Sequence, residues 1–354
     1  MAYTTIDDPT IYFNTVLYAG TGSEQTVSGV NFQPDWTWLK SRSNGQPHVV
    51  SDSVRGATKQ LYTADTQAET SYSQYVKSFN SDGFVLGTDN QINQSSQTFA
   101  SWNWKAGTSF SNSAGANSAT IASTGSVNTD AGFSIISYTG NGNDDDTAKI
   151  AHGLGVAANM IIVKCRNAAG GWQTSSTSLG FNNVLQLNET NAQASGTYAF
   201  GQSGVTPTST VFTVSATSGG NHTNTNNNTY IAYCFAEKKG YSKFGSYVGN
   251  ANADGTFVYL GFKPAWLMLK TTAANTSNWQ MLDNKRQGFN PENETLNPNN
   301  PDAEGTTNTI DFVSNGFKIR TSNAEFNGNG LTYIYMAFAE NPFVTSTGVP
   351  ATAR

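Results

Sequence analysis

One short apolar stretch occurs three times in this chain and constrains its fold more than any other feature. Residues 32–40 read Phe-Gln-Pro-Asp-Trp-Thr-Trp-Leu-Lys, and residues 262–270 read Phe-Lys-Pro-Ala-Trp-Leu-Met-Leu-Lys. Residues 156–164 hold a more divergent copy, Val-Ala-Ala-Asn-Met-Ile-Ile-Val-Lys. Apolar residues on both alternating faces are typical of a strand that is covered on both sides, and Pro, Trp, Ile and Val disfavour a helix. The sequence therefore predicts three buried strands, each in a core of its own.

Further landmarks keep the same order around each copy. A strand that ends in Tyr and a Gly-containing turn precedes the apolar stretch, with Tyr18, Tyr138 and Tyr247 at matching places. An aromatic strand closes each copy, at residues 98–104, 229–237 and 332–340. The spacing of about 110 to 120 residues is too long for a solenoid unit and suits one small domain per copy.

Composition supports a β protein and excludes several other classes. Only 12% of residues are charged while aromatics also reach 12%, which disfavours both a helical protein and a disordered one. A net charge of -5 without a basic block predicts that nucleic acid is not a partner. The chain contains no apolar run long enough for a membrane span, and residues 1–8 lack a signal peptide's apolar stretch.

We therefore predict an all-β chain of three tandem antiparallel β-sandwich repeats, of the jelly-roll or lectin-like kind. The Gly/Ser/Asn-rich segment between the first two copies has few apolar residues and is interpreted as an extended linker. The predicted parts are an N-terminal arm at 1–11, repeat 1 at 12–105, the linker at 106–131, repeat 2 at 132–237, repeat 3 at 243–340 and a C-terminal tail at 341–354.

A pair of opposite charges recurs after the apolar stretch. Asp52 and Arg55 follow it in the first copy, and Asp283 and Arg286 follow it in the third. The second copy has lost both charges, since uncharged residues stand at the two positions. The pairs could form a polar binding site, but an ion pair that fixes a turn against the sheet is the favoured interpretation.

Two other groups raise the question of a metal or a disulfide. Asp144, Asp145 and Asp146 are rich in the oxygen ligands that a hard cation prefers, but they lack the spacing of a known loop, which favours a solvated turn. Cys165 and Cys234 both fall in predicted strands, and two buried thiols are favoured over a disulfide. We expect no cofactor.

The tryptophans divide into two groups. Trp36, Trp104 and Trp266 recur at equivalent strand positions, which is the behaviour of core residues. Trp38 and Trp102 have Ile, Tyr or Met in the other copies. If the protein has a platform on which sugar rings stack, these two residues are its candidates.

No catalytic motif emerges from the sequence. Gly-x-Ser-x-Gly, His-Glu-x-x-His, phosphate-loop and Cys-x-x-Cys patterns are all missing. His48, His152 and His222 stand at different positions in the three copies, which argues against a shared catalytic base. A polysaccharide depolymerase would need two carboxylates about 5–10 Å apart in a groove, whereas the recurring acids lie at ordinary turns and strand ends. We predict that the chain is not an enzyme.

Nearly the whole chain resembles a repeated domain of tailed-bacteriophage virion proteins, common in viruses of marine bacteria and usually labelled tail fibre or virion structural protein. The residues that carry the resemblance are 7–9, 12–20, 33–40, 52–59, 124–140 and 229–237. The resemblance implies a non-enzymatic virion component, such as a tail fibre or other surface appendage that contributes to host attachment. A capsid-decorating protein and, less favoured, a polysaccharide-binding or polysaccharide-degrading tail protein are the alternatives.

The resemblance also bears on assembly. Few charges guard the edges of the predicted sandwiches, and related appendages are usually trimeric, so we expect a homotrimer. The expected partners are other copies of the chain, other virion proteins and a host-surface glycan, with no membrane insertion. The protein would be assembled in the host cytoplasm and reside in the virion, with the turn at residues 7–9 near its attachment point.

Overall fold

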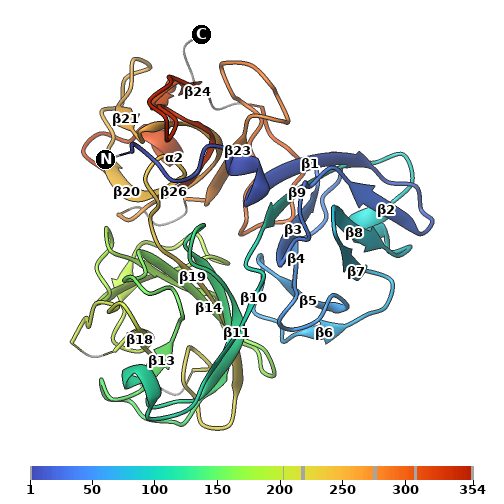
Figure 1. Ribbon diagram of the computed structural model, residues 1–354. Coiled ribbons are helices and arrows are strands. Elements are labelled where there is room, and N and C mark those ends of the chain that lie inside the picture. The colour runs from blue at the N-terminus through green and yellow to red at the C-terminus, as the bar shows by residue number, and fades with distance from the viewer. Residues whose placement is uncertain (1, 202, 217–219, 274–276, 307–308, 352–354) are drawn as a thin grey trace.

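The computed structural model describes residues 2–201, 203–216, 220–273, 277–306 and 309–351. Strand accounts for 41% of the chain and helix for 4%, so the protein is all-β, as predicted, with several antiparallel sheets. The strands form three lobes around a common centre (Figure 1).

Lobe 1 contains the first nine strands and two short helical turns. Its elements are η1 (Pro9–Ile11), β1 (Phe13–Ala19), β2 (Gln25–Ser28), β3 (Trp36–Ser41), β4 (Val49–Asp52), β5 (Lys59–Tyr62), β6 (Thr70–Ser71), β7 (Val76–Asn80), β8 (Gly83–Leu86), α1 (Asn90–Asn93) and β9 (Thr98–Trp104). Its main sheet has the order β1-β9-β3-β4-β5-β6, and a small sheet has the order β2-β8-β7.

Lobe 2 is the largest in number of strands. Its elements are β10 (Thr108–Asn112), η2 (Ala116–Ser118), β11 (Ser123–Asn128), β12 (Phe133–Thr139), β13 (Lys149–Ala151), β14 (Met160–Cys165), β15 (Gln173–Ser176), β16 (Asn183–Gln186), β17 (Ala194–Ser195), β18 (Val211–Thr213) and β19 (Thr229–Phe235). The main sheet runs β10-β11-β12-β19-β14-β15-β16-β17, and the small sheet is β13-β18.

Lobe 3 completes the arrangement. Its elements are β20 (Ser242–Val248), β21 (Phe257–Tyr259), β22 (Phe262–Thr271), β23 (Gln280–Asp283), β24 (Ile310–Val313), β25 (Gly316–Ile319), α2 (Ala324–Asn327) and β26 (Thr332–Pro342). The main sheet is β20-β26-β22-β23 and the small sheet is β21-β25-β24.

The sequence landmarks hold matching positions in the three main sheets. Trp36 lies opposite Trp104 and Asp52 in lobe 1. Met160 in lobe 2 and Trp266 in lobe 3 lie between the corresponding pairs of strands, β19 with β15 and β26 with β23. This shared register defines the residue equivalences used below.

The segment at 106–131, predicted to be an extended linker, instead supplies two strands of lobe 2. β10 pairs with β11, and β11 pairs with β12 along its full length. β10 is the outermost strand and β11 carries few apolar residues, so backbone pairing stabilises both strands more than a run of apolar side chains does, and composition did not reveal them. The linker prediction is therefore wrong, and the edge of β12 is covered.

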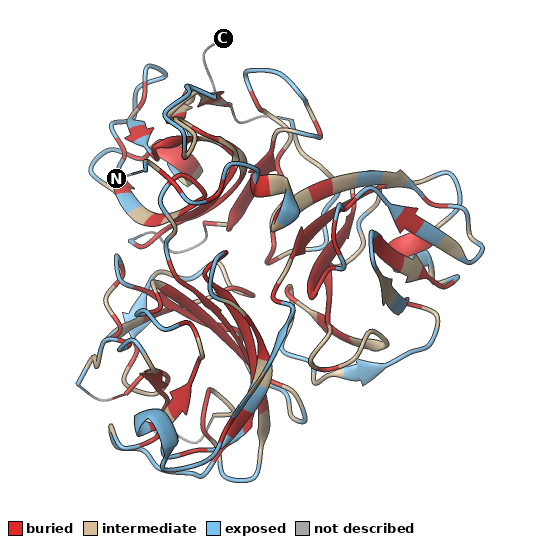
Figure 2. Ribbon diagram, viewed as in Figure 1, coloured by how far each residue is buried: buried red, intermediate tan, exposed pale blue. Residues whose placement is uncertain are grey.

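Each buried central strand faces two cores. In β14, Ile161 and Val163 pack into the core between the two sheets of lobe 2, while Met160 and Ile162 point to the other side. β3 and β22 alternate in the same way. Each lobe thus has its own core, as predicted, but the opposite faces of all three main sheets meet in a fourth, central core (Figure 2).

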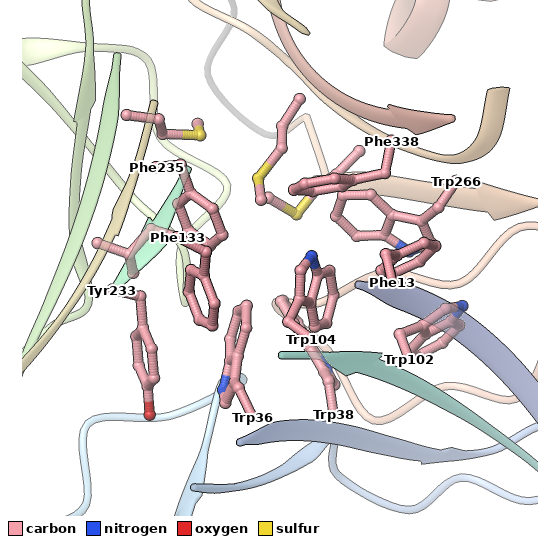
Figure 3. Packing of buried hydrophobic residues seen from close by; sticks show 14 of the residues in the cluster. Phe13, Trp36, Trp38, Trp102, Trp104, Phe133, Tyr233, Phe235, Trp266 and Phe338 are labelled. Atoms are coloured by element: carbon pink, nitrogen blue, oxygen red, sulfur yellow. The ribbon is translucent and has the colours of Figure 1, made fainter. Parts of the chain in front are cut away.

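Aromatic side chains fill the central core (Figure 3). All seven tryptophans of the chain belong to it. Ring centroids lie 4.4 Å apart between Trp36 and Tyr233, which join lobes 1 and 2, and 5.5 Å apart between Trp104 and Trp266, which join lobes 1 and 3. The core role predicted for Trp36, Trp104 and Trp266 is confirmed.

The N-terminal arm crosses from lobe 1 to lobe 3. Ile6 is buried in the central core, and the Tyr3 hydroxyl donates to the Gly261 carbonyl at 2.7 Å. The Asp7 carboxylate accepts a hydrogen bond from the backbone N–H of Ser346, in the C-terminal tail. Met1 and residues 352–354, at the two ends of the predicted arm and tail, lie outside the described residues.

Candidate functional site

Both predicted ion pairs are present and buried at the junctions between lobes. Arg55 Nε lies 2.5 Å from Asp52 Oδ2, and Arg286 Nε lies 2.6 Å from Asp283 Oδ2. Each Asp also caps the turn by accepting from the backbone N–H of its Arg. Burial alone would lower the pKa of each Arg, but the nearby Asp and Glu charges reverse this effect and raise it.

Each Asp also accepts a hydrogen bond from the neighbouring lobe. The Tyr233 hydroxyl of lobe 2 donates to Asp52 Oδ2 at 2.7 Å, and Trp102 Nε1 of lobe 1 donates to Asp283 Oδ2 at 2.9 Å. Tyr233 and Trp102 hold the same register position, opposite the third residue of the buried strand, which is Ile162 in β14 and Trp38 in β3. The two pairs therefore join lobes, in addition to fixing turns.

A glutamate completes each charged junction. Glu69 of lobe 1 accepts from Arg166 of lobe 2 at 2.9 Å and also lies 3.4 Å from Arg55. Glu304 of lobe 3 accepts from Arg42 of lobe 1 at 2.9 Å and from Arg286 of its own lobe at 2.9 Å. Sequence reasoning missed these glutamates because the number of residues that separates each Glu from the Arg of its own repeat differs between the two lobes.

The third junction, between lobes 2 and 3, has lost every one of these charges. Ser176 and Leu179 replace the Asp and Arg, and Met336 of lobe 3 replaces the Tyr or Trp donor. The backbone N–H of Gln193 donates to the Thr272 carbonyl at 2.9 Å, matching the bond made by Glu69 and Glu304 at the other junctions. Since a single remaining charge would be buried without a partner, the neutral replacements compensate one another.

Three buried lysines occupy the ends of the repeated strands. Lys164 donates to the Thr66 carbonyl of lobe 1 at 3.1 Å, and Lys270 donates to the Thr190 carbonyl of lobe 2 at 3.0 Å. Lys40 bonds the Ser41 carbonyl within its own lobe. Burial lowers the pKa of all three lysines to about 8.

Indole groups add a further set of contacts between lobes. Trp172 Nε1 donates to the Tyr62 carbonyl of lobe 1 at 2.8 Å, and Trp279 Nε1 donates to the Gln186 carbonyl of lobe 2 at 3.0 Å. His48 holds the matching position in lobe 1 and accepts from Trp38 Nε1 at Nδ1. Burial lowers the pKa of His48 well below its usual range, so the ring is neutral.

The sugar-stacking prediction for Trp38 and Trp102 is wrong. Both side chains are fully buried in the central core, and both indole N–H groups donate within it. The variation at the Trp102 position reflects the partners that the side chain meets: Trp102 and Tyr233 both reach a carboxylate, while Met336 meets the neutral junction. A ring buried in this way has no face free for a sugar.

The acidic run and the cysteines show ordinary structural roles. Asp145 caps its own turn by accepting from the backbone N–H and hydroxyl of Thr147. Within the described ranges, no group of three or more His, Cys, Asp or Glu side chains is placed to hold a metal ion. Cys165 and Cys234 are free and buried, and burial raises the pKa of both thiols, which makes them unreactive.

One buried acid lies outside the repeat pattern. Glu292 is 3% exposed, and its Oε2 finds no hydrogen-bond partner among the described residues. Burial and the nearby Asp283 charge raise the pKa of Glu292 to about 8. On the same lobe, a hollow of about 540 Å³ is lined by Lys263, Asn290 and Glu340, where Lys263 and Glu340 form an ion pair.

The geometry defines an all-β protein whose three lobes are bonded to one another through a buried polar network. Comparison with known families places it: a family model described as "Domain of unknown function (DUF7483)" matches residues 8–342. The chain belongs to this family, and the match treats all three lobes as one domain. Neither the curated proteins nor the solved structures contain a match. No helix within the described part of the chain is long and apolar enough to cross a membrane.

Proposed function

We propose that this chain is a non-enzymatic structural protein of a tailed-bacteriophage virion, a tail fibre or other surface appendage that contributes to host attachment. It consists, in this proposal, of three tandem β-sandwich repeats of jelly-roll or lectin-like type, each formed by a main and a small sheet. The resemblance of the sequence to virion proteins supplies the biological setting.

The observation that carries the proposal is that the recurring charged residues are buried in contacts between lobes. The side chains of Asp52, Arg55, Asp283 and Arg286 are buried, and each Asp is bonded both to the Arg of its own lobe and to a donor from the neighbouring lobe, so the two pairs serve cohesion. Buried pairs with complete hydrogen bonding favour one specific arrangement of parts, which suits a rigid appendage exposed outside a cell.

Location on the particle is the direct test. Gold-labelled antibodies against the chain, viewed by electron microscopy on intact phage, should mark the tail or its fibres. Label on the head would favour the capsid-decorating alternative instead. Particles without label, from a phage that encodes the chain, would overturn the virion assignment.

Oligomeric state is a separate part of the proposal. β1 and β20 each pair on one side only, so two main sheets have an edge that another copy could cover, while β11 already covers the matching edge in lobe 2. We propose a homotrimer, and light scattering of the purified chain should give three times the mass of one chain. A monomer at micromolar concentration would contradict it.

A further inference from the structure

A patch of exposed aromatic rings lies on the outer face of the small sheet in lobe 3. Phe257 and Tyr259 of β21 are 46% and 50% exposed, and the residue between them is buried. Residues two apart on a strand point to the same side, about 6.7 Å from each other. The Tyr3 hydroxyl lies 3.4 Å from the Tyr259 hydroxyl and extends the patch onto the N-terminal arm, close to β20 and β21 in Figure 1.

The fold itself does not require these two rings. By register, the position of Phe257 is occupied by Thr26 in lobe 1, and that of Tyr259 by Ser28. In lobe 2 the same positions hold Lys149 and a buried alanine. Because Thr, Ser, Lys and Ala occupy these places in the other lobes, the fold does not require aromatic rings there, and the exposed pair in lobe 3 is explained by binding rather than by folding.

Two lysines give the patch a positive charge. Lys239 Nζ lies 4.4 Å from the centroid of the Tyr3 ring, and Lys243 Nζ lies 5.4 Å from that of Tyr259. Neither lysine forms a salt bridge within the described part of the chain, whereas Lys318 on the same sheet is paired with Asp254. The patch is therefore cationic on a chain whose net charge is -5.

We propose that this aromatic–lysine patch, formed by Tyr3, Lys239, Lys243, Phe257 and Tyr259, binds an anionic polysaccharide. The two rings, exposed on the same side of β21, offer apolar faces on which the C–H faces of sugar rings stack, and the lysines bind carboxylate or sulfate groups. The inference names the ligand class for the proposed role in host attachment and rests on that role for its biological setting.

The small number of cations in the patch favours a polysaccharide over a nucleic acid. Nucleic acids carry one charge per nucleotide, and their binding strength comes from neutralising many phosphates at once. Two lysines without a salt bridge can neutralise few phosphates, so the rings supply much of the contact, and sugar rings stack on them. Single-stranded DNA, which also stacks on aromatic rings, becomes a competing outcome in the test.

The test measures binding of the purified full chain by calorimetry to four probes: a polyuronate, dextran sulfate, neutral dextran and oligo-dT. We expect binding of the polyuronate, of dextran sulfate or of both, and the difference between them identifies the anionic group. The double variant F257T/Y259S, which installs the lobe 1 residues, should weaken binding about tenfold or more. K239Q/K243Q should weaken it and reduce its dependence on salt.

Two control variants remove matched groups outside the patch. Tyr72→Thr removes a ring of lobe 1 that is 46% exposed, as Phe257 is, and Lys285→Gln removes an exposed lysine. Both should bind as the unaltered chain does, and unchanged tryptophan fluorescence should verify an intact central core. The proposal is overturned if neither anionic polymer binds, if F257T/Y259S binds unchanged, or if oligo-dT binds more tightly than both. None of these outcomes alters the location test on the particle.

Discussion

At one position of the central core, the residue type matches the hydrogen-bond partner that the neighbouring lobe offers. Tyr233 is buried against Trp36, yet its hydroxyl has a charged acceptor in Asp52. Trp102 meets the same need at the second charged junction. At the third junction Met336 stands in place of the Tyr or Trp donor, and Ser176 stands in place of the carboxylate. From one junction to another, the hydrogen-bond donor and its carboxylate acceptor are therefore present together or replaced together.

Removal of the Tyr233 hydroxyl should be costly. A hydrogen bond to a charged group contributes about 1.5–3 kcal/mol, so Tyr233→Phe should lower the free energy of unfolding by about that amount. Tyr241→Phe is the control, since Tyr241 is also buried in the central core but its hydroxyl makes no hydrogen bond to the described residues. Denaturant titration measures both, and equal stabilities of the two variants would contradict the assigned role.

The buried lysines make stability depend on pH in a defined direction. The pKa of Lys164 falls from its usual value of 10.5 to about 8 in the folded chain. Between pH 8 and 10.5 the unfolded chain binds more protons at this site, so its contribution to stability increases as pH rises. The unaltered chain should therefore gain stability relative to Lys164→Met across this range. A difference that stays constant in urea titrations from pH 7.5 to 10 would refute the assignment.

At the scale of strands, β10 and β11 turn an apparent linker into part of a sheet. Gly125 is needed there, because a Cβ at this position would lie 2.0 Å from the Ile135 carbonyl oxygen of β12. The added strands leave lobe 2 with a covered edge where lobes 1 and 3 have a free one.

Gly125→Ala should therefore destabilise the chain, by at least about 1–3 kcal/mol as in other overpacked sites. Hydrogen exchange should speed up in residues 108–128 above all. Ser113→Ala, in the exposed turn of the same segment, should change neither quantity. Normal stability of Gly125→Ala would mean that the segment behaves as the linker that composition suggested.

Local pattern allowed the strands, the core tryptophans and the charged turns to be predicted. Trp36 and Asp52 recur with their neighbours, and the bonds that join Asp52 to Arg55 span only three residues. Contacts between lobes could not be predicted in this way. The hydrogen bonds from Tyr233 to Asp52 and from Trp102 to Asp283 each connect residues 181 positions apart. No nearby residue in the sequence indicates such a partner. Trp102 was therefore a candidate for sugar stacking, although its indole N–H is bonded to Asp283.

At the scale of the whole molecule, the sequence predicted three separate domains, whereas the structure shows three lobes that share a central core. The main sheet of every lobe buries one face in the central core, and hydrogen bonds between lobes cross each of the three junctions. The family match to residues 8–342 as one domain is consistent with this organisation. Loss of any lobe would expose the aromatic faces of the other two, so we expect the lobes to unfold together.

The distribution of tryptophan makes this claim directly measurable. All seven tryptophans lie in the central core, so their fluorescence reports on that core alone, while far-UV circular dichroism reports on the strands of all lobes. In guanidinium titrations of the full chain, the two signals should give one transition with the same midpoint and slope. If fluorescence is lost at a lower denaturant concentration than the strand signal, the lobes separate while still folded, and the shared core is not what holds the molecule together.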